Sequence, residues 1–483
     1  YTYMRVCVFI CCYIHTYIHN HSFHSINMAT SYYPLGSAAA KKAYQAVIGI
    51  TGVERSNNLT SQLANAIKRN DNLFVKDIGY DDKIPKKKFR QSYSDYTPKG
   101  IFKKNWFEKH TLEIPALLLL VLPFEASLSD KEWEEKEIQL VKDIQRGENQ
   151  VDGSKTKLML ILIQEREYLK SQEGRERAQI AKERVLSLRR CVDFDSKRVH
   201  LVYTADLSNE NSSADMQKLS KTLHSSCIDF YKKASKSVKD MRRFISTSGM
   251  SKEVQYCMSS RLFIKIGHYY ELRREDVKAY KTYKDAYDDL ISIINQKKQK
   301  PSNPNIYNSS KVTINEVKHV AEIICYKLCR LCFLQGRAVE AVRLFRNHMH
   351  QLRDLPIIKD GNNSNSDQLK NTIVQCEKKA WATRQCVNIA SFLHGYQNIL
   401  TEQQKTYEYL QESTFIFMAI SYERQRRMIL NEYLNDNTNS GNEKTSLELD
   451  GNIKIIKSDY IGGTDIVTGT KDKAIIQTTI LNA

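Results

Sequence analysis

The sequence has little proline and glycine, with 8 Pro and 18 Gly in 483 residues. So few turn-forming residues argue against a loop-rich all-β protein and against an extended disordered chain. Tryptophan is scarce as well, at 3 residues, whereas tyrosine reaches 27. Much of the aromatic bulk therefore carries a hydroxyl group that needs a hydrogen-bond partner when it is buried. Hydrophobic residues at 41% and charged residues at 27% are typical of a globular protein.

Long apolar runs are also missing. Residues 6–18 follow Arg5 and have the character of a signal-peptide core, but the run is too short to span a membrane. The chain begins with Tyr1, and a plausible initiator stands at Met28. We therefore predict that residues 1–27 are a leader outside the mature protein. No other segment is apolar over the length of a transmembrane helix, so we expect the rest to be soluble.

The 11 cysteines do not follow the pattern of a small disulfide-bonded secreted domain. Cys325, Cys329 and Cys332 repeat at helical spacing beside an apolar stripe. A structural zinc site needs four converging ligands. Cys329 and Cys332 have the spacing of one ligand pair, but no second cysteine pair stands near them. We interpret these cysteines as reduced core residues, and we expect no bound metal.

Positive charge is in excess, with a formal net charge of +18. Nucleic acid, an anionic membrane or an acidic protein partner would each suit such a charge. The most basic segment is an insertion at residues 80–105, in which aromatic residues are interleaved. Its candidate contacts with an anionic surface are Lys86, Lys87, Lys88, Arg90, Lys103 and Lys104. We interpret it first as a solvated loop, next as a contact with an anionic membrane or acidic partner, and last as a nucleic-acid site, because no nucleic-acid-binding motif accompanies it.

A second basic group repeats at helical spacing. It consists of Lys232, Lys236, Lys239 and Arg243. Charged side chains on one side of an amphipathic helix ordinarily face water, so we interpret this group as a solvated helix face.

From residue 28 to residue 211, short apolar runs alternate with helical patterns. Residues 46–50, 116–122, 158–163 and 198–203 are predicted strands, and the aliphatic ones suit burial on both faces. Ser129 and Glu132 form a capping box ahead of a helix predicted over residues 130–145. This alternation predicts an α/β domain with a doubly wound, mostly parallel sheet.

From residue 212 the pattern becomes helical throughout. Apolar stripes run through residues 280–294 and 317–331, and further stripes follow up to residue 430. Successive antiparallel amphipathic helices usually stack as hairpins into a superhelix. We therefore predict an α-helical solenoid, similar to tetratricopeptide repeats, over residues 212–430. Residues 431–483 are polar and are predicted to be a low-order tail or a truncated end.

Candidate catalytic motifs are weak. Residues 49–54 follow the first strand, where a nucleotide-binding loop would lie, but they lack the third glycine of a dinucleotide loop and the lysine of a P-loop. Residues 153–156 precede a strand instead of a helix. We interpret both segments as turns, and we predict no cofactor and no enzymatic activity. Two alternatives stay open: a nucleotide-binding α/β enzyme with a helical appendage, and an RNA-binding solenoid.

Several segments resemble one known family. Residues 105–110 and 114–116 resemble the N-terminal region of subunit 11 of the trafficking protein particle (TRAPP) complex, and residues 261–273, 279–287, 341–348 and 381–385 resemble its foie gras domain. The residues that carry this likeness are Trp106, His110, Pro115, Arg261, Tyr269, Tyr270, Ala279, Tyr280, Tyr287, Phe345, His348, Trp381 and Gln385.

The resemblance to this family implies a scaffolding subunit of a tethering complex in vesicle-mediated transport, between endoplasmic reticulum and Golgi and within the Golgi. Its implied partners are the other TRAPP subunits and, indirectly, a Rab GTPase whose activation it supports without catalysis. The implied location is cytoplasmic, at the periphery of Golgi or intermediate membranes. Nucleic acid is not an expected partner.

Overall fold

The computed structural model describes residues 45–52, 57–70, 73–85, 100–103, 106–164, 172–208, 214–247, 250–299, 312–355, 367–439, 453–457 and 464–468. The predicted leader at residues 1–27 lies outside the described residues, as do Lys86, Lys87, Lys88, Arg90 and Lys104 of the basic insertion.

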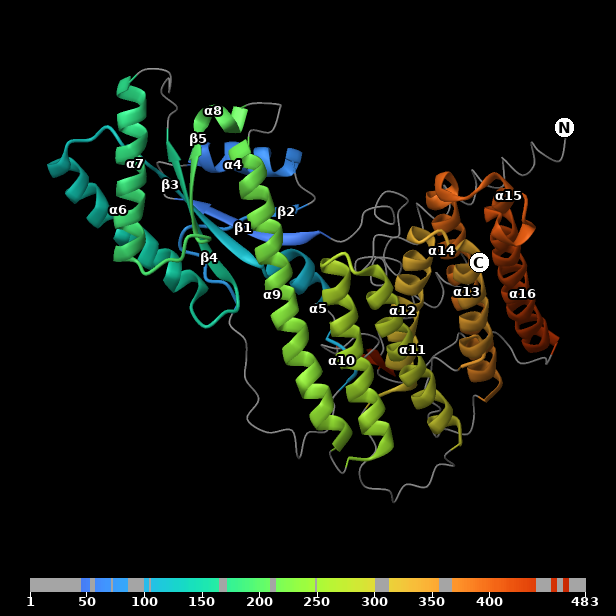
Figure 1. The fold of residues 1–483 in the computed structure, drawn as a ribbon. Coiled ribbons are helices and arrows are strands. Elements are labelled where there is room, and N and C mark those ends of the chain that lie inside the picture. Colours follow the sequence, from blue (N-terminus) through green and yellow to red (C-terminus); the bar gives the residue numbers. More distant parts are fainter. Residues whose placement is uncertain are drawn as a thin grey trace.

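A parallel sheet forms the centre of the N-terminal part (Figure 1). Its strands lie in the order β2-β1-β3-β4-β5, and every neighbouring pair is parallel. The bounds of the strands are β1 (Ala46–Gly52), β2 (Leu73–Asp77), β3 (Leu117–Pro123), β4 (Lys157–Gln164) and β5 (Val199–Tyr203). The predicted parallel α/β sheet is confirmed. Strand β2 was not among the predicted strands, because it is a short edge strand in which Phe74 and Asp77 are exposed and no aliphatic run marks it.

Helices cover both faces of this sheet. On one face lie α4 (Asn57–Asn70), α8 (Thr204–Ser208) and the first half of α9 (Ala214–Thr247). On the other face lie α6 (Asp130–Val151) and α7 (Gln172–Cys191). Strand β3 shows why its sequence is wholly aliphatic: Leu117 and Leu119 pack toward α4, whereas Leu118 and Leu120 pack toward α6. A strand with two covered faces has no position for a polar side chain.

The C-terminal part is a two-layered stack of helices, which confirms the predicted α-solenoid (Figure 1). Side-chain contacts connect α10 (Lys252–Leu272), α12 (Ile314–Leu334) and α14 (Asp367–Tyr396) in one layer. They connect α11 (Asp276–Gln299), α13 (Ala338–Leu352) and α16 (Glu412–Asn439) in the other. The short helix α15 (Glu402–Lys405) precedes α16. The predicted apolar stripes at 280–294 and 317–331 lie in the core between these layers, as Tyr283, Leu290 and Val317 show.

Helix α9 belongs to both parts of the molecule. Met216, Leu219 and Leu223 in its first half pack on the sheet. Ile245 near its end packs with Val254 and Met258 of α10. Its 34 residues extend about 51 Å at 1.5 Å per residue. One continuous helix thus connects the sheet to the stack, immediately after the boundary that the sequence predicts at residue 211.

The domain boundaries themselves stay predictions. Helix α16 continues to Asn439, past the predicted end of the solenoid at residue 430. Strands β6 (Ile453–Lys457) and β7 (Thr464–Thr468) form an antiparallel pair within the segment predicted as a tail. In the part of the chain that the structure describes, no helix combines the length and the apolar character required to cross a bilayer.

Candidate functional site

The sheet domain and the helical stack meet at a short segment that precedes β3. It comprises residues 100–103, helix α5 (Trp106–Glu108) and a π-helical turn, η2 (Lys109–Glu113). Arg261 of α10 donates to the carbonyl oxygen of Ile101 at 2.6 Å and to that of Gly100. The end of the basic insertion is thereby fixed to the stack, and Lys103 beside it is exposed.

Trp106 is the centre of the aromatic contacts at this junction. Its ring stacks on His110, with centroids 4.1 Å apart, and meets the ring of His268 edge-on at 5.4 Å. Tyr269 approaches at 6.1 Å from the same helix, α10. Nδ1 of His110 donates to the carbonyl of Trp106 at 2.9 Å. Burial lowers the pKa of His110 to about 4, so this ring is neutral at physiological pH.

A buried ion pair lies beneath these rings. The ammonium group of Lys327, on α12, is 2.6 Å from the carboxylate of Glu271, on α10. The hydroxyl of Tyr283, on α11, also donates to Glu271. The ring of Phe107, from α5, lies 5.0 Å from the ammonium nitrogen of Lys327 and covers it from the side of the sheet domain. Four helices therefore converge on one pair of opposite charges.

A second buried network connects α11, α12, α13 and α14 of the stack. The hydroxyl of Tyr287 lies 3.0 Å from Nδ1 of His348. Trp381 donates its indole N–H to Glu322, and the ammonium group of Lys318 stands 4.0 Å from the centroid of the Trp381 ring. Charge and aromatic surface are thus combined between α11, α12, α13 and α14.

Burial shifts the pKa values of this second network. Burial is the main reason that the pKa of His348 is lowered to about 4 and that of Lys318 to about 8. The pKa of Glu322 is lowered to about 2, because bonds from His319 and Trp381 outweigh the raising effect of its burial. His348 is neutral at physiological pH, whereas Glu322 is charged.

The residues that carry the family likeness are mostly packing residues of these two networks. Trp106, His110, Arg261 and Tyr269 form the junction, and Tyr287, His348 and Trp381 form the second network. The others pack or form hydrogen bonds elsewhere in the fold. The carbonyl of Pro115 accepts from Thr156, Tyr270 accepts from Lys239, and Gln385 accepts from Tyr326. Tyr280 donates to Glu340, Phe345 contacts Phe415, and Ala279 is buried.

Glu271 and Lys327 were not among the residues predicted from the sequence. Lys327 stands between Tyr326 and Leu328 in the apolar second half of α12, and a lysine in such a position is rarely buried without a partner. That partner, Glu271, lies 56 residues earlier, so the sequence alone does not pair the two.

The three cysteines of α12 are buried in the core of the stack, at 2% exposure or less. Burial raises the pKa of the Cys332 thiol to about 12, which keeps it protonated. Within the described ranges, no group of three His, Cys, Asp or Glu side chains is arranged to hold a metal ion.

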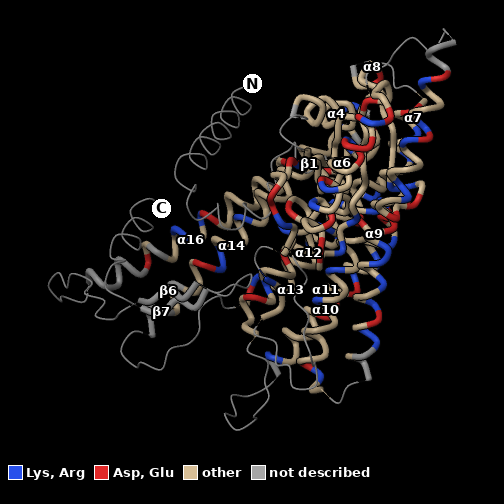
Figure 2. The backbone as a smooth tube through the Cα atoms, turned by 90° about the vertical axis from the view of Figure 1, so that its left-hand side faces the viewer, with Lys and Arg blue, Asp and Glu red and all other residues tan. Residues whose placement is uncertain are grey.

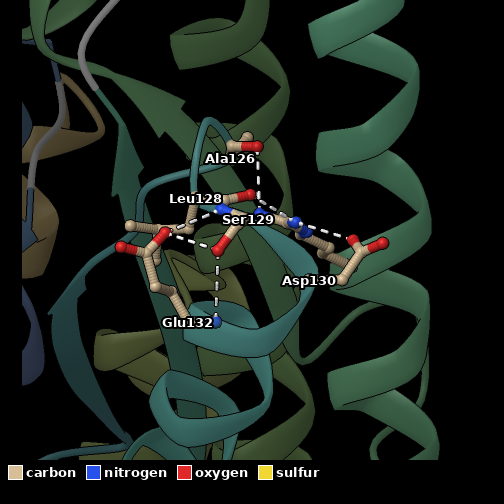
Figure 3. A network of polar contacts seen from close by, with 6 residues as sticks. Ala126, Leu128, Ser129, Asp130 and Glu132 are labelled. Carbon is tan, nitrogen blue, oxygen red and sulfur yellow. Dashed lines mark hydrogen bonds and ion pairs between the residues drawn. The ribbon is translucent and has the colours of Figure 1, made fainter.

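The carboxyl ends of β1 and β3 mark the point where a doubly wound sheet usually binds its ligand. A Cβ atom on Gly49 would lie 2.5 Å from Cδ1 of Ile78, so this glycine permits close packing within the sheet domain. At the start of α6, Glu132 accepts from the backbone N–H and the hydroxyl of Ser129 at 2.9 and 2.7 Å (Figure 3). The predicted capping box is confirmed. The N-terminus of α6 is thus capped by side chains of the chain itself.

The loop ahead of α6 is held from α7. Arg184 donates to the carbonyl oxygens of Ala126 and Leu128 at 3.0 and 2.7 Å, and it lies 3.4 Å from Asp130 (Figure 3). Arg184 itself is buried. These bonds fix the loop in the conformation that presents Ser129 as the cap.

Two family models match the chain. Residues 91–211 match the trafficking protein particle complex subunit 11 N-terminal domain, and residues 313–448 match the Foie gras liver health family 1. The curated proteins named trafficking protein particle complex subunit 11 from Gallus gallus, Bos taurus and Homo sapiens are each 26% identical over 260 residues. That alignment covers 54% of this chain and 20% of each relative, so the matched part spans a fifth of the relatives' length.

The first matched region contains β3, β4 and β5 with Trp106, and the second contains α12, α13, α14 and α16 with Lys318, His348 and Trp381 of the second buried network. One match thus lies in the sheet domain and the other in the helical stack, with α9, α10 and α11 between them. The chain therefore resembles TRAPP complex subunit 11 in its sheet domain and the foie gras family in its helical stack.

Proposed function

We propose that this chain is a scaffolding part of a TRAPP-type tethering complex in vesicle-mediated transport. The observation that carries the proposal is the buried Glu271–Lys327 pair beneath the Trp106 cluster. Together with the continuous helix α9, it makes the sheet domain and the solenoid one rigid unit. A rigid body with an extended helical surface is suited to hold other subunits at fixed positions.

The partners in this proposal are the other TRAPP subunits. Through them the chain supports activation of a Rab GTPase without performing the exchange, at the cytoplasmic side of Golgi and intermediate membranes. The names of the relatives support membership in the complex. The capped N-terminus of α6 and the packing role of Gly49 favour a non-catalytic sheet domain.

The basic insertion is proposed as an additional contact with an anionic surface. Its exposed Lys103 lies next to the backbone that Arg261 anchors to α10, so the end of the insertion has a fixed place on the molecule. Lys86, Lys87, Lys88, Arg90 and Lys104 would contribute the remaining charge.

The test is affinity purification of the tagged chain from cytosol, with the bound proteins identified by mass spectrometry. We expect the remaining subunits of a TRAPP complex in the eluate. A chain that elutes alone, or only with unrelated proteins, contradicts the proposal. A parallel measurement of thermal stability with added nucleotides tests the enzymatic alternative, which a saturable rise in melting temperature would favour.

A further inference from the structure

The outward face of α9 carries a straight line of positive charge. The α9 basic stripe consists of Lys218, Lys221, Lys232, Lys236, Lys239 and Arg243, all exposed. An α-helix turns by 100° per residue, so Lys218 and Lys236, which are 18 residues apart, point in the same direction. The other four lie within about 60° of that direction by the same rotation. Figure 2 shows Lys and Arg recurring along this helix at the edge of the molecule.

Packing on the opposite side of the helix fixes this orientation. Leu219, Leu223 and Tyr231 lie against the sheet, and Ile245 lies against α10. The stripe therefore follows α9 from the sheet domain to the stack. From Lys218 to Arg243 it measures about 38 Å at 1.5 Å per residue.

The acidic residues near the stripe do not cancel it. Asp229 lies 3.9 Å from Lys232, and Asp240 lies 3.8 Å from Arg243. With the exposed Asp215, which lies three residues before Lys218, three carboxylates stand against six cations. Lys239 additionally donates to the hydroxyl of Tyr270 at 2.6 Å, which holds its ammonium group at the surface of the stack. The stripe carries a net positive charge in total, in two groups separated by residues 222–231, which contain no Lys or Arg.

The composition of the stripe points to one class of partner. Five of its six cations are lysines, which are strongly hydrated point charges without the fork of arginine. No aromatic side chain stands between them on the exposed side to stack on a base, as single-stranded nucleic acid requires. The face is straight. Clustered lysines are attracted electrostatically, at short range, to a surface that carries many negative charges, such as an anionic membrane.

We propose that the α9 basic stripe binds the surface of a bilayer that contains anionic phospholipids. The proposal draws on the trafficking role stated above, but it assigns a new surface that is separate from the basic insertion. Helix α9 lies along the membrane surface with its lysines toward the headgroups. Because α9 is packed on both the sheet and α10, this contact sets the orientation of both parts relative to the membrane.

The experiment uses the full chain and sedimentation with vesicles of phosphatidylcholine alone or mixed with phosphatidylserine. The test variant carries Lys218→Gln, Lys232→Gln and Lys236→Gln. The control carries Lys131→Gln, Lys142→Gln and Lys182→Gln, three exposed lysines on α6 and α7, across the sheet from α9. Both variants have the same net charge, and circular dichroism verifies that both are folded.

We expect the unmodified chain to sediment with vesicles that contain phosphatidylserine and to be released by salt. The α9 variant should bind on the order of 100-fold more weakly, since each cation near an anionic surface contributes roughly fivefold. The control should stay within a few fold of the unmodified chain. Equal losses in both variants, or no loss in the α9 variant, overturn the proposal.

A second arm measures binding of the same three proteins to single-stranded RNA. RNA binding that depends on the stripe, without any dependence of lipid binding on it, overturns the membrane proposal in favour of a nucleic acid. Copurification with TRAPP subunits is measured on the α9 variant as well. If the α9 variant keeps its TRAPP partners but loses lipid binding, the scaffold role and the membrane contact are separate properties of the chain.

Discussion

The ammonium nitrogen of Lys327 lies 2.6 Å from a carboxylate oxygen of Glu271, and neither side chain is more than 1% exposed. The pair joins α10 to α12, and the ring of Phe107 from the sheet domain covers the lysine. A buried charge is tolerated only where an opposite charge and hydrogen bonds compensate for the loss of water. Folding of the stack and docking of the sheet domain are therefore coupled at this point.

Removing one member of this pair should destabilise the protein strongly. Glu271→Ala leaves the charge of Lys327 buried without its partner, and we expect a loss of about 3–5 kcal/mol in the free energy of unfolding. The double variant Glu271→Leu with Lys327→Met should lose less, because it removes the charge of Lys327 together with that of its partner, although the 4.0 Å contact of Arg330 with Glu271 is lost in addition. Urea unfolding monitored by circular dichroism measures both. A double variant that is as unstable as the sum of the single ones would show that the pair is not coupled.

The buried His348 should make stability depend on pH. Its pKa is about 4 in the folded protein, whereas an unfolded histidine has a pKa near 6.5. Between these values the unfolded chain binds a proton that the folded chain does not, so stability falls as pH falls from about 6.5 to about 4. The expected total is about 3 kcal/mol for this residue.

Replacement of His348 by Gln should reduce the slope of stability against pH in that window. The control is His350→Gln, which changes an exposed histidine on the same helix. Unfolding in urea at several pH values gives both slopes. An unchanged slope in the His348 variant would mean that this ring is already protonated in the folded protein.

Lys318 should weaken the stack while it is charged. Burial lowers its pKa to about 8, below the value near 10.4 of an unfolded lysine. Lys318→Met keeps an unbranched side chain against Trp381 and removes the buried charge, so we expect a gain of roughly 1–3 kcal/mol at neutral pH. In the unmodified protein the folded state loses its proton first, so stability rises with pH between about 8 and 10.4.

The gain from Lys318→Met should therefore shrink as the pH approaches 10. Chemical unfolding of the two proteins at neutral and alkaline pH provides the comparison. A variant that is less stable than the unmodified chain would show that the contact of the ammonium group with Trp381, or its attraction to Glu322, outweighs its desolvation.

Ser129 caps α6, so Ser129→Ala should lower the free energy of unfolding by about 1 kcal/mol, the usual effect of losing a serine N-cap. Ser127→Ala, in the same loop, is the matched control because its hydroxyl caps no helix. The melting temperatures of the two variants test this prediction, and that of Ser129→Ala should be the lower one. Equal values would indicate that the bonds from Arg184 alone hold this loop.

The sequence by itself determined the type of each long element. Aliphatic runs such as 116–122 indicate a strand covered on both faces, and the apolar stripe at 317–331 indicates a helix, because hydrophobic periodicity is a local property of the chain. The burial of α12 on nearly all sides was not part of that pattern. The Ser129–Glu132 cap is local as well, because its two partners are only three positions apart. Edge strand β2 carries no such local pattern, since one of its faces is partly exposed and its side chains are mixed.

The tertiary structure alone decided which residues meet. Trp106 reaches His268 across more than 150 residues, and Glu271 reaches Lys327 across 56. Neither pairing is encoded in a local period: the first depends on how the segment of Trp106 rests on α10, and the second on how α10 packs beside α12. The same holds for the α9 basic stripe: the lysine spacing is visible in the sequence, but the packing of α9 on the sheet and on α10 decides that this side faces outward.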